Sequence, residues 1–426
     1  MSKFQIQGPN RLSGEISVLG AKNVALKLIA ATVLIKAKVT LTNMPEILDI
    51  QNMLEILEKN GANIKKNGHT ITIDTTNLTD ADPDSELMEK LRASIVYIGP
   101  YLARFGQVNV PRPGGCSIGS RSIEVHLDGF HQMGVEIVHR KDVNDEKSID
   151  HLYHLSCHDL YGQNINLTKA SCTATENIIM ASVLIPGKTV INNAAREPQI
   201  NDLANFLNSA GASITGAGTS EIEIIGTESL HGLEYEIMPD PIEAGTFVCL
   251  ALATGSEIKV TNCKPDHLRP FLDKISEIGA EFEVGEDYIL VKPSVNLQPT
   301  NFETKVFPGF PTDLQAPMGL VLTQAKGESQ IKESLFENRL GYLMELEKMG
   351  AKIKIKNNQE ASIYGPTKLH GAEIASLDLR AGATVLLAGL AATGMTIIDN
   401  AEMIDRGYEK IEERLAKLGA NIKRIA

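Results

Sequence analysis

The sequence predicts an α/β protein of two domains, each built from three copies of one βαβαββ unit. Three observations lead to this prediction. Six amphipathic helical stretches run through a glycine into a β-like segment, at Gly61, Gly134, Gly211, Gly279, Gly350 and Gly419, which lie about 70 residues apart. An apolar stretch of helical length precedes each of them, and residues 4–16 repeat the pattern of residues 362–374. Spacing this regular indicates one folding unit used six times.

The six apolar stretches are expected to be buried helices. They cover residues 23–35, 92–103, 175–185, 244–255, 314–325 and 381–394. Because they are hydrophobic nearly all round, each should lie inside its unit. The same argument assigns the uncharged stretch 381–398 to a buried core helix and not to a membrane span, since it carries three Gly and three Thr in a charged chain. A short strand, a polar loop, the amphipathic helix and two more strands should follow each apolar helix.

The N-terminus is predicted to complete the last unit. Gly8-Pro9, Leu12 and Gly14 match Gly365-Pro366, Leu369 and Gly371, so residues 4–16 can supply the strands that the sixth unit lacks. One domain should therefore cover residues 22–238, and the other residues 1–21 with 239–426. A chain that crosses twice between two domains without a long linker is typical of a hinged pair around a cleft.

Composition limits the kind of function. The chain has 426 residues with 43% hydrophobic content, enough for two full cores, and a formal charge of −12 that argues against nucleic-acid and membrane partners. Five cysteines without CxxC spacing, and no apolar leader, predict free thiols in the cytoplasm. His154 and His158 form one HxxxH pair without an acidic third ligand, so we expect no metal site.

Polar and charged residues gather at two positions of the repeated unit. Lys22, Asn23, Arg92, Lys169, Ser171, Asp313, Asp378 and Arg380 fall at the start of a buried helix, whereas Cys116, Arg121, Arg196, Glu197, Arg339 and Arg406 fall in the loop before an amphipathic helix. A single arginine in such a place is usually a solvated or ion-paired residue. Basic residues repeated near helix N-termini, which already carry partial positive charge, indicate an anionic ligand with phosphate or carboxylate oxygens.

Several strings resemble those of a known family. They are GAKN at Lys22, LRAS at Arg92, PGGCSIGSR around Cys116, NAAREP at 193–198, PTDLQA around Asp313, FENR at Arg339, DLRAGA around Arg380 and IDRGYE around Arg406. Together they resemble the enolpyruvyl transferases, in particular the UDP-N-acetylglucosamine 1-carboxyvinyltransferases, over the whole chain. The resemblance implies a pair of inside-out α/β barrels with the active site in the cleft between the domains. It also implies enolpyruvyl transfer from phosphoenolpyruvate to the 3-hydroxyl of UDP-N-acetylglucosamine, the first committed step of peptidoglycan synthesis, without a cofactor.

The resemblance also assigns roles to residues. It implies that Lys22 and Asn23 contact phosphoenolpyruvate, that Arg121 closes on its phosphate, and that Arg380 and Arg406 hold its carboxylate. The nucleotide-sugar site would be lined by Arg92, Arg121, Ser122, Ile123, Glu124, Val125, Lys169, Ser171, Cys172, Asp313 and the backbone of Leu335. Asp313 would accept the proton of the sugar hydroxyl. Asp378 and Glu197 would orient arginines or serve as plain ion-pair partners, and Arg339 would belong to the same site.

Cys116 lies between Gly114-Gly115 and Gly119, a setting that favours a loop able to close over bound substrates. The resemblance implies that its thiol protonates C3 of phosphoenolpyruvate or, as thiolate, attacks C2, and that fosfomycin alkylates it. Cys172, Glu124 and Pro241 depart from the residues common in the family, which bears on substrate affinity. Two alternatives are enolpyruvyl transfer to shikimate 3-phosphate, whose enzymes lack the functional lid cysteine, and a non-catalytic repeat scaffold, in which charges would be scattered over the repeats.

Overall fold

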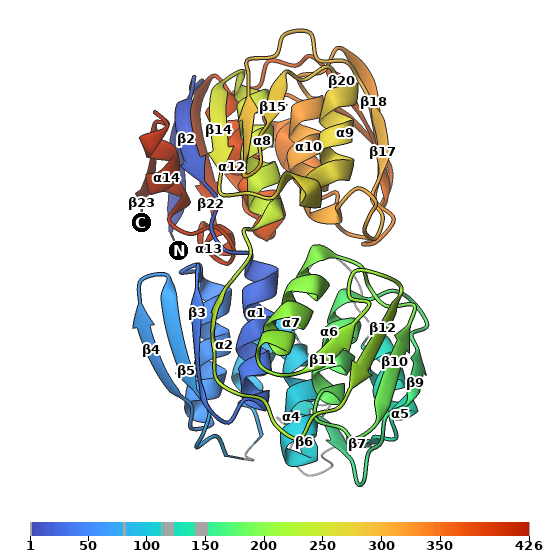
Figure 1. The fold of residues 1–426 in the computed structure, drawn as a ribbon. Coiled ribbons are helices and arrows are strands. Elements are labelled where there is room, and N and C mark those ends of the chain that lie inside the picture. The colour runs from blue at the N-terminus through green and yellow to red at the C-terminus, as the bar shows by residue number, and fades with distance from the viewer. Residues whose placement is uncertain (1, 80–81, 112–113, 115–122, 141–151, 426) are drawn as a thin grey trace. The chain divides into compact units, whose positions relative to one another are not determined.

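The computed structural model describes residues 2–79, 82–111, 114, 123–140 and 152–425. They form two compact units. The first unit consists of the described residues between 22 and 238, and the second of residues 2–21 with 239–425. Each unit carries three β-sheets in its described part (Figure 1).

The strands of the first unit form sheets in the orders β13-β3-β5-β4, β6-β8-β7 and β9-β10-β12-β11. Their bounds are β13 (Glu234–Glu236), β3 (Lys38–Thr42), β5 (Thr70–Asp74), β4 (Asn63–Asn67), β6 (Gln107–Pro111), β8 (Leu152–Ser156), β7 (Glu136–Arg140), β9 (Asn164–Asn166), β10 (Lys188–Asn192), β12 (Glu221–Ile225) and β11 (Ser213–Thr215). The helices are α1 (Lys22–Ala31), α2 (Leu48–Lys59), α3 (Ser85–Lys90), α4 (Ile98–Phe105), α5 (Glu124–Gln132), α6 (Cys172–Ser182) and α7 (Pro198–Ser209).

The second unit has sheets in the orders β2-β14-β16-β15, β17-β18-β20-β19 and β21-β22-β1-β23. Their bounds are β2 (Ser13–Ser17), β14 (Glu257–Thr261), β16 (Tyr288–Val291), β15 (Phe282–Val284), β17 (Asn301–Glu303), β18 (Gly327–Lys332), β20 (Glu360–Gly365), β19 (Lys352–Asn357), β21 (Glu373–Ala375), β22 (Gly394–Asp399), β1 (Lys3–Gly8) and β23 (Ile422–Ile425). The helices are α8 (Pro241–Thr254), α9 (Arg269–Glu277), α10 (Gln315–Leu322), α11 (Tyr342–Lys348), α12 (Leu379–Ala391), α13 (Glu402–Asp405) and α14 (Ile411–Lys417).

The repeated unit predicted from the sequence is confirmed in these elements. In each four-stranded sheet an outer strand runs parallel to its neighbour, and that neighbour pairs with the nearer of two strands that are antiparallel to each other. A complete βαβαββ unit runs β9, α6, β10, α7, β11 and β12. Helices α8, α10 and α12 contact one another and are nearly fully buried, with strands around them in Figure 1. These three apolar helices are therefore the centre of the second unit, as their all-round hydrophobicity predicted.

Three predicted helices differ from the structure in form, and the one predicted at residues 23–35 ends in a 3₁₀ turn from Thr32 to Leu34. Residues 92–103 make a 3₁₀ turn from Arg92 to Tyr97 and then α4, because Pro100 has no N–H to donate and the Gly99 N–H donates to Asn177 Oδ1 (2.9 Å). The uncharged stretch 381–398 is a helix only as far as Ala391 and continues as β22 after Gly394, whose φ is +99°. Among the described residues, no helix is long and apolar enough to cross a membrane.

The repeat also fixes unusual backbone conformations. The six glycines that end the amphipathic helices all have positive φ, from +77° to +103°. Asn43, Asn193, Asn262 and Asn400 follow β3, β10, β14 and β22 with φ between +51° and +60°. The first three donate their side-chain amides to carbonyls of Ile237, Leu167 and Val18, at 2.9, 2.9 and 2.7 Å. Each of these three asparagines thus ties a strand to the end of its parallel neighbour.

Strand β1 lies between β22 and β23, with Phe4 opposite Ile398 on one side and Arg424 on the other. It takes the place that β20 takes between β18 and β19. The equivalent glycines at the ends of these strands are sterically required, since a Cβ on Gly8 would lie 2.3 Å from the carbonyl oxygen of Ala392, and one on Gly365 would lie 2.4 Å from that of Ala325.

Candidate functional site

The second unit brings three of the predicted site residues together around one carboxylate. Arg339 Nη2 lies 2.6 Å from Asp313 Oδ1, and Arg380 reaches Oδ2 through Nε at 3.2 Å and Nη2 at 3.1 Å. Both guanidinium groups are buried, whereas the Asp313 side chain is 26% exposed. Asp313 lies in the 3₁₀ turn before α10, and Arg380 in the first turn of α12, two helices that pack on each other. The repeat therefore places the carboxylate and Arg380 at neighbouring helix starts.

Hydrogen bonds continue from this cluster on both sides. Arg339 Nη1 donates to Thr312 Oγ1 (2.8 Å), whose hydroxyl donates to Glu333 Oε2 (2.8 Å). On the other side Arg380 Nη1 donates to the hydroxyl of Tyr408 (3.0 Å). Burial alone would lower the pKa of the Arg380 guanidinium, but Tyr408, Asp313 and Asp240 together raise it, so Arg380 is a permanent cation.

The other predicted residues of this unit take different places. Asp378 caps α12, because its Oδ1 accepts the N–H groups of Arg380 and Ala381 at 2.8 and 3.0 Å. Leu335 is exposed, and its N–H donates to Glu333 Oε1 (2.9 Å). Arg406 follows α13 and is half-buried.

In the first unit, Lys22 and Asn23 begin α1, and Lys22 is already paired. Its Nζ lies 2.6 Å from Asp49 Oδ2 on α2, and both side chains are buried. Asp49 was not predicted from the sequence, because the basic residues were interpreted as partners of an anionic ligand and not of a carboxylate within the protein. An ammonium carries three N–H donors, a chemistry that suits an anionic ligand.

The segment of Lys169 to Cys172 leads into α6. Lys169 is exposed, Ser171 caps the helix by accepting the Ala174 N–H (3.4 Å), and Cys172 is its first residue. Burial raises the pKa of the Cys172 thiol well above its usual range, and the Glu197 and Glu176 carboxylates act in the same direction. Cys172 is therefore a neutral thiol beside Glu197, which is the N-cap residue of α7.

Arg92, which is half-buried, begins its 3₁₀ turn. Ile123 is the N-cap residue of α5, and Glu124 and Val125 are the first residues of that helix. Asn177 Nδ2 donates to His126 Nδ1 (3.0 Å), so the ring proton lies on Nε2 and points to Thr173 Oγ1 (3.0 Å). Burial, with Arg92 nearby, lowers the pKa of His126 to about 3. Cys116, Arg121 and Ser122 lie outside the described residues.

A set of buried polar side chains lies about one helical turn further along α1 and α6 than Lys22 and Cys172. Lys27 on α1 places Nζ 3.5 Å from Glu176 Oε2 on α6, and Gln199 on α7 donates to Glu176 Oε1 (3.0 Å). Lys27 and Glu176 are almost inaccessible to solvent. Burial raises the pKa of Glu176 to about 7 despite the opposing effect of Lys27. The signal for this group was present in the sequence, since each helix carries a charge inside an otherwise apolar run.

Replacing this pair by neutral residues should change how stability depends on pH. Because the pKa of Glu176 is about 7 in the folded protein and about 4.5 when unfolded, its contribution lowers stability as pH rises from 4.5 to 7. The shift corresponds to about 3 kcal/mol. Lys27→Met/Glu176→Gln keeps an acceptor for Gln199 and removes both charges. Relative to the unchanged protein, the free energy of unfolding should therefore gain about 2.5 kcal/mol more at pH 8 than at pH 5, because part of the effect is already present at pH 5.

Urea denaturation at the two pH values measures this gain. The matched control is Lys188→Met/Glu223→Gln, which removes an exposed pair at 2.6 Å and should alter stability by less than about 1 kcal/mol at either pH. Equal gains at pH 5 and pH 8 in the buried variant would contradict the raised pKa of Glu176.

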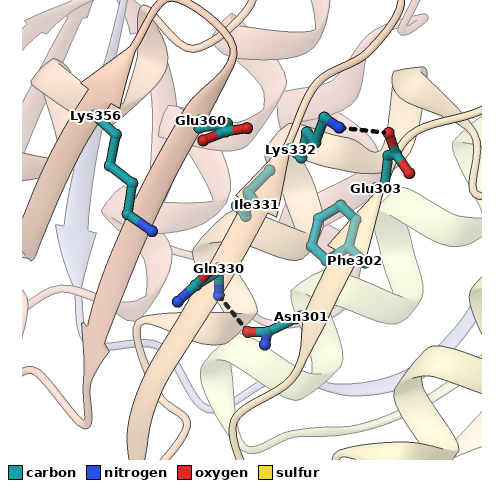
Figure 2. Close-up of a pocket in the computed structure, with 8 residues that line it drawn as sticks. All are labelled: Asn301, Phe302, Glu303, Gln330, Ile331, Lys332, Lys356 and Glu360. Atoms are coloured by element: carbon teal, nitrogen blue, oxygen red, sulfur yellow. Dashed lines mark hydrogen bonds and ion pairs between the residues drawn. The ribbon is translucent and has the colours of Figure 1, made fainter.

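A pocket of about 330 Å³ lies elsewhere, on the sheet of β17, β18, β20 and β19 (Figure 2). It is lined by Asn301, Phe302, Glu303, Gln330, Ile331, Lys332, Lys356 and Glu360, which include none of the predicted site residues. Its Lys332 and Glu303 form an exposed ion pair at 3.1 Å, and Glu303 also pairs with Lys305 at 3.0 Å. Such pairs are typical of the solvated face of a sheet, so the candidate site is the Asp313 cluster and not this pocket.

Known proteins match the chain over its whole length. A family model described as EPSP synthase (3-phosphoshikimate 1-carboxyvinyltransferase) matches residues 6–415. A protein of Carboxydothermus hydrogenoformans named UDP-N-acetylglucosamine 1-carboxyvinyltransferase 2 is 44% identical, with 100% of both chains covered. A UDP-N-acetylglucosamine 1-carboxyvinyltransferase of Proteus mirabilis is 43% identical over 100% of this chain and 99% of its own.

Solved structures agree in fold. The enolpyruvyl transferase NikO from Streptomyces tendae superposes with a TM-score of 0.88 at 26% identity, covering 100% of this chain and 99% of its own. An EPSP synthase from Acinetobacter baumannii superposes with a TM-score of 0.74 at 19% identity over 100% of both chains. At that identity the second likeness concerns the fold alone.

Proposed function

Because this chain belongs to the enolpyruvyl transferase family whose model is described as EPSP synthase, we propose that it transfers the enolpyruvyl group of phosphoenolpyruvate to the 3-hydroxyl of UDP-N-acetylglucosamine, releasing phosphate. The observation that carries this choice of acceptor is the 39–44% identity, over essentially the full chain, to relatives named for that acceptor. The EPSP synthase structure is 19% identical. The lid string PGGC around Cys116 favours the same acceptor.

The proposed chemistry begins with addition across the double bond of phosphoenolpyruvate. The sugar 3-hydroxyl oxygen bonds to C2, its proton passes to Asp313, and C3 receives a proton from Cys116. Phosphate then leaves C2 while C3 returns a proton to the Cys116 thiolate, which restores the double bond in the product. Asp313 suits the base role because a carboxylate can accept a proton, and the arginine contacts hold this carboxylate in one orientation.

Basic side chains supply the binding of anionic substrates in this proposal. Lys22 and Asn23 would hold phosphoenolpyruvate with Arg121, and Arg406 and Arg380 would face its carboxylate. The nucleotide sugar would contact Arg92, the residues from Arg121 to Val125, Lys169 to Cys172 and Leu335. Residues of both units are needed, so we also propose that the two units are the domains of the enzyme. Glu197, Asp378 and Arg339 would act by holding these groups in place.

The direct test is release of inorganic phosphate. The purified protein, mixed with phosphoenolpyruvate and UDP-N-acetylglucosamine, should release one phosphate for each nucleotide sugar consumed, and shikimate 3-phosphate in place of the nucleotide sugar should give none. Release with shikimate 3-phosphate alone would favour the alternative acceptor. No release with either would leave the repeat scaffold as the remaining hypothesis.

Within this proposal the reaction is the first committed step of peptidoglycan synthesis, which links the protein to cell-wall biogenesis, cell shape and division. Fosfomycin is expected to inhibit it by alkylating Cys116. The four cysteines that the structure describes are free thiols, which supports a cytoplasmic enzyme.

A further inference from the structure

A buried chain of hydroxyl groups supports Arg380 from the side opposite Asp313. Arg380 Nη1 donates to Tyr408 Oη at 3.0 Å, and Tyr408 Oη lies 2.9 Å from Thr246 Oγ1. Thr246 Oγ1 in turn lies 2.7 Å from the carbonyl oxygen of Ile242 in the first turn of α8. Tyr408 and Thr246 are completely buried, and Arg380 is 4% exposed.

The donor and the acceptor of each hydrogen bond in this series can be assigned. The guanidinium can only donate, so Tyr408 Oη accepts from Arg380. The Ile242 carbonyl can only accept, so the Thr246 hydroxyl donates to it and its oxygen is left to accept from Tyr408. The direction therefore runs from Arg380 through Tyr408 and Thr246 to α8. Burial raises the pKa of Tyr408, which keeps the hydroxyl protonated and able to donate.

Local packing brings the tyrosine to this place. Tyr408 follows Gly407, where a Cβ would lie 2.7 Å from the Leu379 side chain at the start of α12. The absence of a side chain at Gly407 lets the segment after α13 approach α12 closely. The guanidinium carbon of Arg380 then lies 5.4 Å from the centroid of the Tyr408 ring. The Tyr408 ring restricts movement of the Arg380 guanidinium on one side, and the Tyr408 hydroxyl restricts rotation of the guanidinium.

We infer that Tyr408 is a positioning residue for the proposed reaction: through Arg380, it holds the Asp313 carboxylate in the orientation from which that carboxylate receives the proton of the sugar hydroxyl. Each nitrogen of the Arg380 guanidinium has a contact, since Nε and Nη2 both meet Asp313 Oδ2 and Nη1 meets Tyr408. Without the hydroxyl, Nη1 loses this acceptor, and the guanidinium can rotate away from the geometry that places Asp313. This inference rests on the proposed function, because it concerns the base of that reaction.

Tyr408→Phe, which keeps the ring and removes only the hydroxyl, tests the inference. We expect kcat to fall about ten- to a hundredfold, the range that a lost hydrogen bond to a charged group produces. The dissociation constant for UDP-N-acetylglucosamine, measured by calorimetry, should stay within about threefold. The matched control is Tyr342→Phe, in the same unit and equally buried, because in the described part of the chain the Tyr342 hydroxyl has no hydrogen-bond partner. Its kcat should stay within about twofold.

A second pair of variants shows whether the effect passes through Arg380. A lysine has one nitrogen and cannot hold Asp313 and Tyr408 as the guanidinium does. In an Arg380→Lys background, Tyr408→Phe should therefore change kcat by less than about twofold. Equal losses in the Arg380→Lys background and in the unchanged protein, or a kcat for Tyr408→Phe like that of Tyr342→Phe, would overturn the inference. Failure of the proposed function is recognised separately, since the unchanged protein would then release no phosphate.

Discussion

Asp313→Asn should lower kcat at least about a hundredfold, because the amide cannot accept the hydroxyl proton that the carboxylate receives. The amide keeps nearly the same shape, so affinity for UDP-N-acetylglucosamine should stay within about tenfold. Arg339 and Arg380 lose the carboxylate that both contact, at 2.6 and 3.1 Å, so the variant should also melt at a lower temperature. Single-turnover phosphate release, calorimetric binding and thermal unfolding measure the three effects.

The control for this change is Asp405→Asn in the same unit. Asp405 contacts Arg424 at 2.7 Å, and its side chain is 33% exposed, close to the 26% of Asp313. It should show a comparable loss of melting temperature while its kcat stays within about twofold. A kcat near normal in a folded Asp313→Asn protein would place the base elsewhere.

Cys116→Ser should leave almost no turnover while both substrates still bind. The proposed role is to deliver a proton to C3, and a serine hydroxyl is far too weak an acid to do so near neutral pH. We expect kcat to fall at least about a hundredfold, the usual contribution of general acid catalysis. Stopped-flow phosphate release and nucleotide-sugar binding check the two halves of this expectation.

Cys116→Asp is the informative counterpart. A carboxyl group, with an ordinary pKa of about 3.9, can be raised by desolvation until it carries a usable proton, so this variant should turn over with a more acidic pH optimum. It should also resist fosfomycin, because a carboxylate is a poor nucleophile toward an epoxide. An inactive aspartate variant that folds and binds both substrates would instead assign Cys116 a covalent role.

Much of the fold could be predicted because the unit is repeated six times. The recurring glycines mark helix ends in every copy, and all six have the positive φ that such ends require. The asparagines after β3, β10, β14 and β22 recur with the same regularity but were overlooked, because a polar residue after a strand is a common feature of loops. The 3₁₀ turn before α4 could not be predicted from hydrophobicity, because a hydrophobic pattern does not show that Pro100 lacks a backbone N–H.

The site was predictable in its residues and less so in their contacts. Arg339, Asp313 and Arg380 were singled out separately, and only the packing of α10 against α12 explains why one carboxylate meets two guanidinium groups. Tyr408 lies two residues after Arg406 in IDRGYE, but a hydroxyl that acts through another side chain gives no charge signal in a sequence. Asp49 was invisible for a similar reason, since it neutralises Lys22 from a different helix.

The pairing of β1 with β22 and β23 has a consequence for synthesis on the ribosome. Residues 3–8 emerge early, but both strands that flank them belong to residues 394–425. At a translation rate of roughly 5–20 residues per second, this segment waits about 20 to 80 s for its partners. The first unit, whose sheets in the described residues use strands between Lys38 and Glu236, has these strands long before β22 and β23 emerge. Nascent chains should therefore complete the first unit before the second, with residues 3–8 exposed to chaperones until β22 and β23 have emerged.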